Sequence, residues 1–143
     1  MLGETTKNDK EDSIMYQKVA PMLLVENVEE AVKWYGKVLG AKLQSSLPNN
    51  PPFEWASLGL GNVEIMFSKK KSAQKWYSDA VIVSETPANF IAYIYVENAD
   101  NLYERIKDNA KIVMEPTDQW YGLREFAIRD PFGFTLIFAQ IIG

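Results

Sequence analysis

A stripe of apolar residues at i, i+3, i+4 and i+7 predicts an amphipathic helix in the first half of the chain, and the stripe returns 71 residues later. The first stripe consists of Val28, Ala31, Val32 and Tyr35, and the second of Ala99, Leu102, Tyr103 and Ile106. Residues 19–67 as a whole recur at 90–138 with the same shift. The sequence therefore predicts one structural unit that is used twice.

Around each helix the apolar pattern predicts the same order of elements: one strand, the helix, then three strands. Asn27 is a helix-capping residue with Glu30 three positions later, and Gly40 suits the left-handed turn that ends a helix. The predicted strands are 16–26, 41–45, 54–58 and 63–67 in the first copy, and 89–96, 111–114, 124–129 and 134–139 in the second, whose helix is 99–108.

Two copies are too few for a solenoid, so we expect them to pack as halves of one α+β domain. That domain is predicted over residues 15–143, with modules at about 15–68 and 89–141 joined by a loop at 69–88. A loop of this length is often a lid or a binding edge. Residues 1–14 contain few core-forming side chains, and we expect a disordered leader or a cloning remnant there.

Composition narrows the classes of function. The 143 residues are 47% apolar and 13% aromatic, which is enough to build a sizeable core. A net charge of −4 and an isoelectric point near 4.9 disfavour a nucleic-acid partner. The chain has no cysteine and no apolar stretch of the roughly 20 residues that cross a bilayer. A soluble, cytoplasmic protein without disulfides or membrane contact is expected.

Four sequence runs resemble the vicinal oxygen chelate superfamily, which includes glyoxalase I, extradiol dioxygenases, fosfomycin resistance enzymes and bleomycin resistance proteins. They are Val25-Glu26-Asn27, Trp34-Tyr35, Val38-Leu39-Gly40-Ala41 and the closing segment 122–133. The resemblance covers residues 16–140 and implies two tandem βαβββ modules whose curved mixed sheets surround a cleft. It also implies a homodimer, because a second subunit commonly completes such clefts.

In enzymes of this superfamily, His and Glu side chains from the first and last strands of each module hold a divalent metal. The resemblance places those positions at Ala20, Met66, Ile91 and Ile137 here, and the chain has no histidine. Apolar side chains cannot bind a hard cation. We therefore expect no metal, no other cofactor and no glyoxalase or dioxygenase activity, and we assign no catalytic residue.

The same strands predict a binding face instead. Period-two alternation places apolar and aromatic side chains on the cleft side of the first and last strands, and large aromatics also occur in a loop after Pro116. Tyr93 and Tyr95 fit ligand contact and core filling equally well, and Trp55 fits stacking on a ligand and packing at the sheet edge equally well. The predicted ligand-binding residues are Met22, Leu24, Trp55, Glu64, Met66, Tyr93, Tyr95, Trp120, Tyr121, Arg124 and Ile137.

Three functions remain open at this point. The first, favoured by the aromatic content, is a metal-independent protein that sequesters a planar or cationic small molecule, such as an antibiotic, as bleomycin resistance proteins do. The second is a metal-free enzyme of lyase or isomerase type, with Glu64, Glu125 or a tyrosine as acid or base. The third is a non-catalytic scaffold whose cleft is filled by its own side chains.

Overall fold

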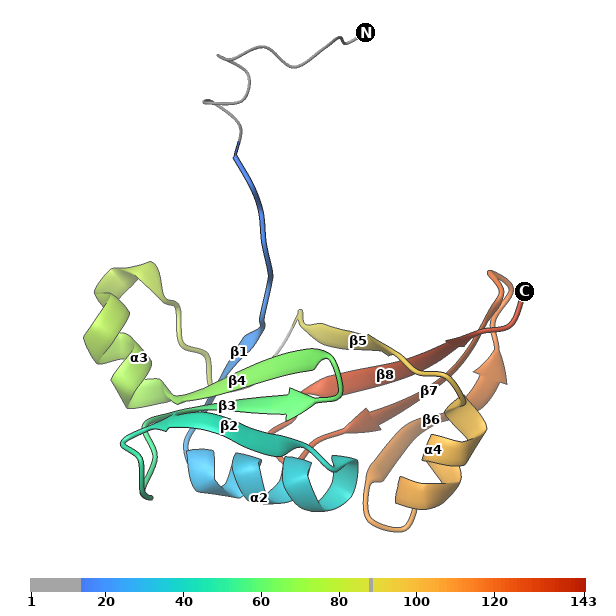
Figure 1. The fold of residues 1–143 in the computed structure, drawn as a ribbon, viewed down its shortest axis with the longest axis horizontal. Coiled ribbons are helices and arrows are strands. Elements are labelled where there is room, and N and C mark those ends of the chain that lie inside the picture. Colours follow the sequence, from blue (N-terminus) through green and yellow to red (C-terminus); the bar gives the residue numbers. More distant parts are fainter. Residues whose placement is uncertain (1–13, 88) are drawn as a thin grey trace, which may run out of the picture.

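The computed structural model describes residues 14–87 and 89–143. The predicted leader therefore lies outside the described residues, except for Ile14. Within these described residues, two four-stranded sheets and three α-helices make up the fold (Figure 1). The first sheet and α2 (Val28–Leu39) occupy one side of the molecule, and the second sheet and α4 (Ala99–Ile106) occupy the other, with α2 below the first sheet in this view.

The two sheets have the same topology, which confirms the tandem βαβββ prediction. The first sheet has the order β1-β4-β3-β2 and the second β5-β8-β7-β6. In each, the first strand is parallel to the last, and the other pairs are antiparallel. The strands are β1 (Met22–Val25), β2 (Lys42–Leu47), β3 (Trp55–Leu60), β4 (Val63–Lys69), β5 (Ile91–Tyr95), β6 (Lys111–Asp118), β7 (Leu123–Arg129) and β8 (Thr135–Ile141).

The helix ends follow the sequence signals. The Asn27 side chain accepts a hydrogen bond from the Glu30 N–H at 3.0 Å, and Gly40 ends α2 in the left-handed region at φ 74°. Asn98 caps α4 in the same way, accepting from the Asn101 N–H at 2.9 Å. Helix α4 ends at Ile106, two residues before the predicted end.

The two modules share one hydrophobic core. Both helical stripes point into it, and Val28, Ala31 and Ala99 are fully buried. The other face of each sheet is left open, so that within the described residues the two sheets remain separate and do not close into one barrel. A hydrogen bond from Tyr35 of α2 to Asp130, in the turn between β7 and β8, links the modules.

The connection between the modules differs from the prediction of a loop. Residues Lys70–Tyr77 form helix α3, followed by a short 3₁₀ helix, η1 (Ser78–Ala80). Ser72 and Ala73 are buried, and the Ser72 hydroxyl donates to the Glu54 carboxylate at 3.0 Å. Helix formation here depends on these tertiary contacts, because Lys69 at the helix start offers no side-chain cap.

Several strand boundaries also differ from the prediction. Strand β1 begins at Met22 rather than residue 16, and residues 14–21 run away from the body of the molecule (Figure 1). Tyr16 and Val19 in this arm are 90% and 92% exposed. Strand β6 continues to Asp118, four residues beyond the prediction, and β2 continues to Leu47. No helix in the described part of the chain is long and apolar enough to span a membrane.

Candidate ligand-binding face

The second sheet has one buried face and one open face. Ile94, Phe126 and Phe138 point into the core and are at most 8% exposed. Their neighbours alternate to the opposite side, where the strand register places Tyr93 beside Ile137, and Ile137 beside Ala127. On this open face Tyr93 is 38% exposed and Tyr95 is 63% exposed. These two tyrosines therefore do not fill a closed core.

A carboxylate lies at the centre of the open face. Glu125 of β7 is only 2% exposed, and both of its oxygens accept hydrogen bonds from tyrosines. The Tyr121 hydroxyl donates to Oε1 at 2.8 Å, and the Tyr93 hydroxyl donates to Oε2. Tyr121 comes from the turn between β6 and β7, so the carboxylate links this turn to β5.

The two tyrosine hydroxyls act as donors at neutral pH. Loss of solvent around the phenols raises the pKa of Tyr93 and Tyr121, and their hydrogen bonds to Glu125 raise it further. Both groups therefore keep their protons. This state suits a fixed hydrogen-bonding role better than proton abstraction, which needs a pKa close to the working pH.

Two further aromatic side chains extend this arrangement. The ring of Tyr95 packs edge-on against Tyr93 with centroids 5.3 Å apart, and Trp120 packs edge-on against Tyr121 at the same separation. Trp120 is 93% exposed. We name Tyr93, Tyr95, Trp120, Tyr121 and Glu125 the aromatic–carboxylate cluster. Such exposed aromatic surface, next to a few polar groups, is typical of small-molecule recognition.

The first sheet has a second open face with a different polar group. Met22, Met66 and Ser57 lie in one row of this face according to the strand register, and Leu24 and Trp55 flank Ser68 in the next row. Glu64 accepts a hydrogen bond from the Ser57 hydroxyl at 2.5 Å and pairs with Lys18 of the arm at 2.6 Å. The contact with Lys18, followed by that with Ser57, lowers the pKa of Glu64. This carboxylate is thus already neutralised by a cation.

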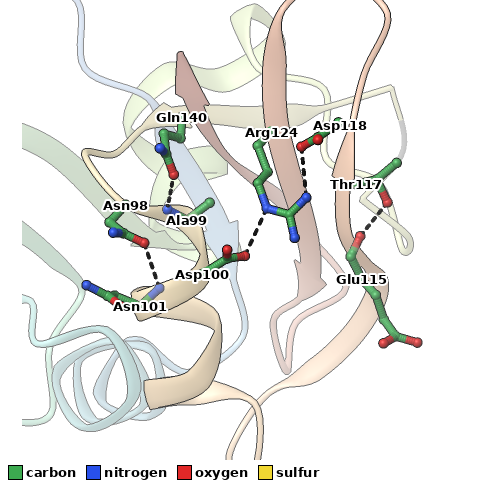
Figure 2. Close-up of polar contacts among 9 residues, drawn as sticks. All are labelled: Asn98, Ala99, Asp100, Asn101, Glu115, Thr117, Asp118, Arg124 and Gln140. Carbon is green, nitrogen blue, oxygen red and sulfur yellow. Dashed lines mark hydrogen bonds and ion pairs between the residues drawn. The ribbon is translucent and has the colours of Figure 1, made fainter. Parts of the chain in front are cut away.

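Arg124 lies apart from both open faces, although the sequence predicted it among the ligand-binding residues. It alternates with Glu125 along β7 and therefore points to the opposite side of the strand. Figure 2 shows its guanidinium between Asp100 of α4, at 2.9 Å, and Asp118 of β6, at 2.8 Å. Arg124 thus links helix α4 to the second sheet through two ion pairs and forms none with Glu125.

Glu125 was absent from the predicted ligand-binding residues. The sequence indicated it only as a candidate acid or base of a metal-free enzyme, together with Glu64 or a tyrosine. In the structure Glu54, Glu64 and Glu125 each contact a different hydroxyl group. The pairing of β7 with β8 decides which side chains of β7 lie on the open face. With that pairing, the alternation along β7 places Glu125 on the same face as Tyr93.

The superfamily's metal positions offer no ligand set in this chain. The strand register places Met66 beside Met22 and Ile137 beside Tyr93, each two residues along from Ala20 and Ile91, so the four predicted positions do not pair directly. Their side chains are apolar or thioether groups, which hard cations do not bind. Over residues 14–87 and 89–143, no three side chains of His, Cys, Asp or Glu gather in a way that would hold a metal ion.

A cavity of about 630 Å³ adjoins the open face of the first sheet, where β1 meets the connection between the modules and the turn between β7 and β8. Apolar side chains form much of its wall, and Lys70 and Glu26 form an ion pair at its edge, 3.5 Å apart. The sequence did not predict this cavity, because it depends on how three distant segments meet. Its wall includes Met22, Leu24, Phe90, Phe132 and Phe134.

The duplicated topology and the open faces define a class of protein built from paired βαβββ modules. Residues 17–138 match the family model described as the Glyoxalase/Bleomycin resistance protein/Dioxygenase superfamily. The chain belongs to this superfamily, which confirms the resemblance found in the sequence. No curated protein matches the chain in sequence.

Solved structures with the same fold include TioX from Micromonospora sp. ML1, with a TM-score of 0.69 and 22% identity over 89% of this chain and 100% of that one. A glyoxalase/bleomycin resistance protein/dioxygenase from Nocardioides gives a TM-score of 0.73 and 17% identity, over 94% and 90% of the two chains. The bleomycin-binding protein from bleomycin-producing Streptomyces verticillus, complexed with copper(II)-bleomycin, gives 0.63 and 20%, over 90% and 98%. At these identities the likeness concerns the fold.

Proposed function

We propose that this protein binds and sequesters a planar small molecule, such as an antibiotic, on the open face of its second sheet, without a metal. The observation that carries the proposal is the aromatic–carboxylate cluster, in which exposed aromatic rings surround one buried carboxylate. Planar ligands stack on such rings at little cost in conformational entropy. The copper(II)-bleomycin complex of the S. verticillus protein supports small-molecule binding by this fold.

The proposal includes a homodimer in the cytoplasm. Each open face carries exposed apolar side chains, among them Ile91 at 57% and Tyr95 at 63% on the second sheet and Leu47 at 55% on the first. Large apolar side chains exposed on an open sheet face favour an interaction with another surface. A second copy would cover part of it and would turn an open face into a walled cleft.

Binding is a better account of the cluster than acid–base catalysis or a filled scaffold. The raised pKa values of Tyr93 and Tyr121 favour fixed hydrogen-bond donors over proton-transfer groups. Trp120 is 93% exposed, and a scaffold that filled its own cleft would have little use for such a side chain. The apolar residues at the superfamily's metal positions favour metal-independent binding.

Titration of tryptophan fluorescence with planar drugs, beginning with bleomycin and continuing through charged and neutral compounds, tests this function. The dimer is verified first, and each titration is repeated in excess chelator. Saturable quenching that survives the chelator and is lost in Trp120→Ala is the expected result. Trp76→Ala is the matched control, because Trp76 lies on α3 and is 43% exposed. Absence of quenching by every compound, or quenching that only Trp76→Ala removes, would refute the proposal.

A further inference from the structure

We infer that Glu125 is the residue that sets the charge specificity of this site, and that the ligand is an organic cation whose positive group lies over Tyr93 and Tyr121. The inference rests on the proposed function and adds the chemical class of the ligand. It assigns to Glu125 the role of positioning the positive charge of the ligand. The residues at the superfamily's metal positions cannot do this in this chain, because their side chains carry no charge.

The argument starts from the cost of burying Glu125. A carboxylate that is 2% exposed loses most of its hydration, and proteins usually compensate such a charge with a cation. Here two phenolic hydroxyls are its partners. Within the described part of the chain, no Lys or Arg nitrogen lies within ion-pair distance of Glu125. The negative charge of this buried group therefore lacks a counterion.

The neighbouring cations do not neutralise it. Arg124 points to the other side of β7 and is held by Asp100 and Asp118. Arg129 shares the open face with Glu125, but it lies four residues further along the strand, roughly 13 Å away at the usual rise per residue. Lys18 belongs to the first sheet, where it pairs with Glu64.

The second sheet therefore differs from the first in a way that matters for ligand charge. Each open face contains one carboxylate that accepts hydroxyl hydrogen bonds, Glu64 on the first and Glu125 on the second. Of these two carboxylates, only Glu64 has a described lysine or arginine nitrogen within ion-pair distance. A ligand on the second sheet can supply the missing positive charge itself.

The two tyrosines connect the buried charge of Glu125 with the exposed surface, because their hydroxyls contact the carboxylate and their rings are accessible. A phenol that donates a hydrogen bond to a carboxylate becomes richer in electrons, which strengthens the attraction of its ring for a cation. Tyr93 is 38% exposed and Tyr121 is 46% exposed, so their rings are accessible while their hydroxyls contact Glu125. A flat cation stacked on these rings would meet both the ring faces and the carboxylate behind them.

Two probes of the same three-ring shape test the inference: 9-aminoacridine, which is protonated at neutral pH, and acridine, which is neutral. Their affinities for the full-length dimer are measured by isothermal titration calorimetry at low salt. We expect the wild type to bind the cation about tenfold or more tightly than the neutral probe, the factor that corresponds to one favourable charge interaction of modest size.

Glu125→Gln keeps the shape of the side chain and one acceptor oxygen but removes the charge. We expect it to weaken 9-aminoacridine binding about tenfold and to change acridine binding by less than about twofold. Glu115→Gln is the matched control, because it removes an exposed carboxylate from the neighbouring strand β6. It should leave both affinities unchanged.

The outcomes separate the two proposals. If both probes bind equally to the wild type, and Trp120→Ala weakens both, the face binds planar molecules and the charge inference is wrong. If Glu125→Gln weakens both probes equally, Glu125 acts only as a structural support, and the inference is again wrong. If neither probe binds and no planar drug quenches Trp120, the proposed function itself fails. The wild-type comparison decides the matter even if Glu125→Gln does not fold.

Discussion

The hydroxyl of Tyr35 lies 2.6 Å from a carboxylate oxygen of Asp130, and this hydrogen bond joins α2 of the first module to the turn between β7 and β8 of the second. Both side chains are buried, with exposures of 1% and 4%. Asp130 also accepts hydrogen bonds from the N–H groups of Phe132 and Phe134, at 2.9 and 2.8 Å. One carboxylate thus shapes the turn and ties the two modules together.

We expect Tyr35→Phe to lower the free energy of unfolding by about 1 to 3 kcal/mol, because it leaves one buried oxygen of Asp130 without its donor. Urea denaturation of both proteins measures the difference. Tyr77→Phe is the control, since Tyr77 is 46% exposed and should lose little. Equal stabilities of wild type and Tyr35→Phe would show that the hydrogen bond does not stabilise the junction between the modules.

The same aspartate should make stability depend on pH. Burial raises the pKa of Asp130 above its ordinary value of 3.8, although the hydrogen bonds from Tyr35 and the turn oppose this shift. The folded protein therefore holds this proton more tightly than the unfolded chain. Its contribution to stability is present at acid pH and is lost as the pH rises from 3.8 through the folded pKa.

Asp130→Asn cannot titrate, but its amide can still serve Tyr35 and the turn. As the pH rises above 3.8, we expect this variant to gain stability relative to the wild type, until Asp130 is fully ionised. Denaturation at a series of pH values measures this difference, in which the titrations common to both proteins cancel. A difference that stays constant, or that moves in favour of the wild type, would contradict the raised pKa.

Gly133 tests the contact between the turn and the connection that joins the modules. Its φ is +95°, and a Cβ there would lie 2.9 Å from Cγ of Pro87. Gly61 has a φ of +60° and open space around it, so Gly61→Ala shows the backbone cost alone. We expect Gly133→Ala to be the more destabilising of the two by about 1 kcal/mol or more, because overpacking adds to the backbone strain. Equal losses in thermal denaturation would mean that Pro87 moves away freely.

We expect Arg124 to stabilise the start of α4 and to have no effect on ligand affinity. Replacing it with alanine removes both ion pairs that link α4 to β6 and β7 (Figure 2). We expect faster amide hydrogen exchange at the start of α4 and an unchanged affinity for 9-aminoacridine. If Arg124→Ala lost as much affinity as Glu125→Gln, Arg124 would be shown to contribute to ligand binding.

The sequence predicts the overall fold well because the duplication supplies the same information twice. Asn27 and Asn98 cap equivalent helices, and the shared shift identifies equivalent strands. Helix α3 was missed because its stability depends on the burial of Ser72 and Ala73 rather than on a capping residue. The cavity beside β1 could not be predicted, since it is formed by segments far apart in the chain.

The candidate site was predicted in part. Tyr93, Tyr95, Trp120 and Tyr121 were selected from strand alternation and loop position, and the structure brings them together around Glu125. Arg124 was selected and Glu125 was not, although they are adjacent and point to opposite sides of β7. An error of one residue in the strand alternation exchanges the faces assigned to these two residues. The pairing of β7 with β8 decides which of them lies on the open face.

Hydrogen exchange of the protein, with and without 9-aminoacridine, tests most directly whether the second sheet's open face is the binding site. We predict that the ligand slows exchange in β5, in the turn of residues 119–122 and in the adjoining part of β7. The segments around β1 and residues 82–87, which line the separate cavity, should be unaffected. Slower exchange in those segments alone would place the ligand in that cavity and would contradict the binding face proposed here.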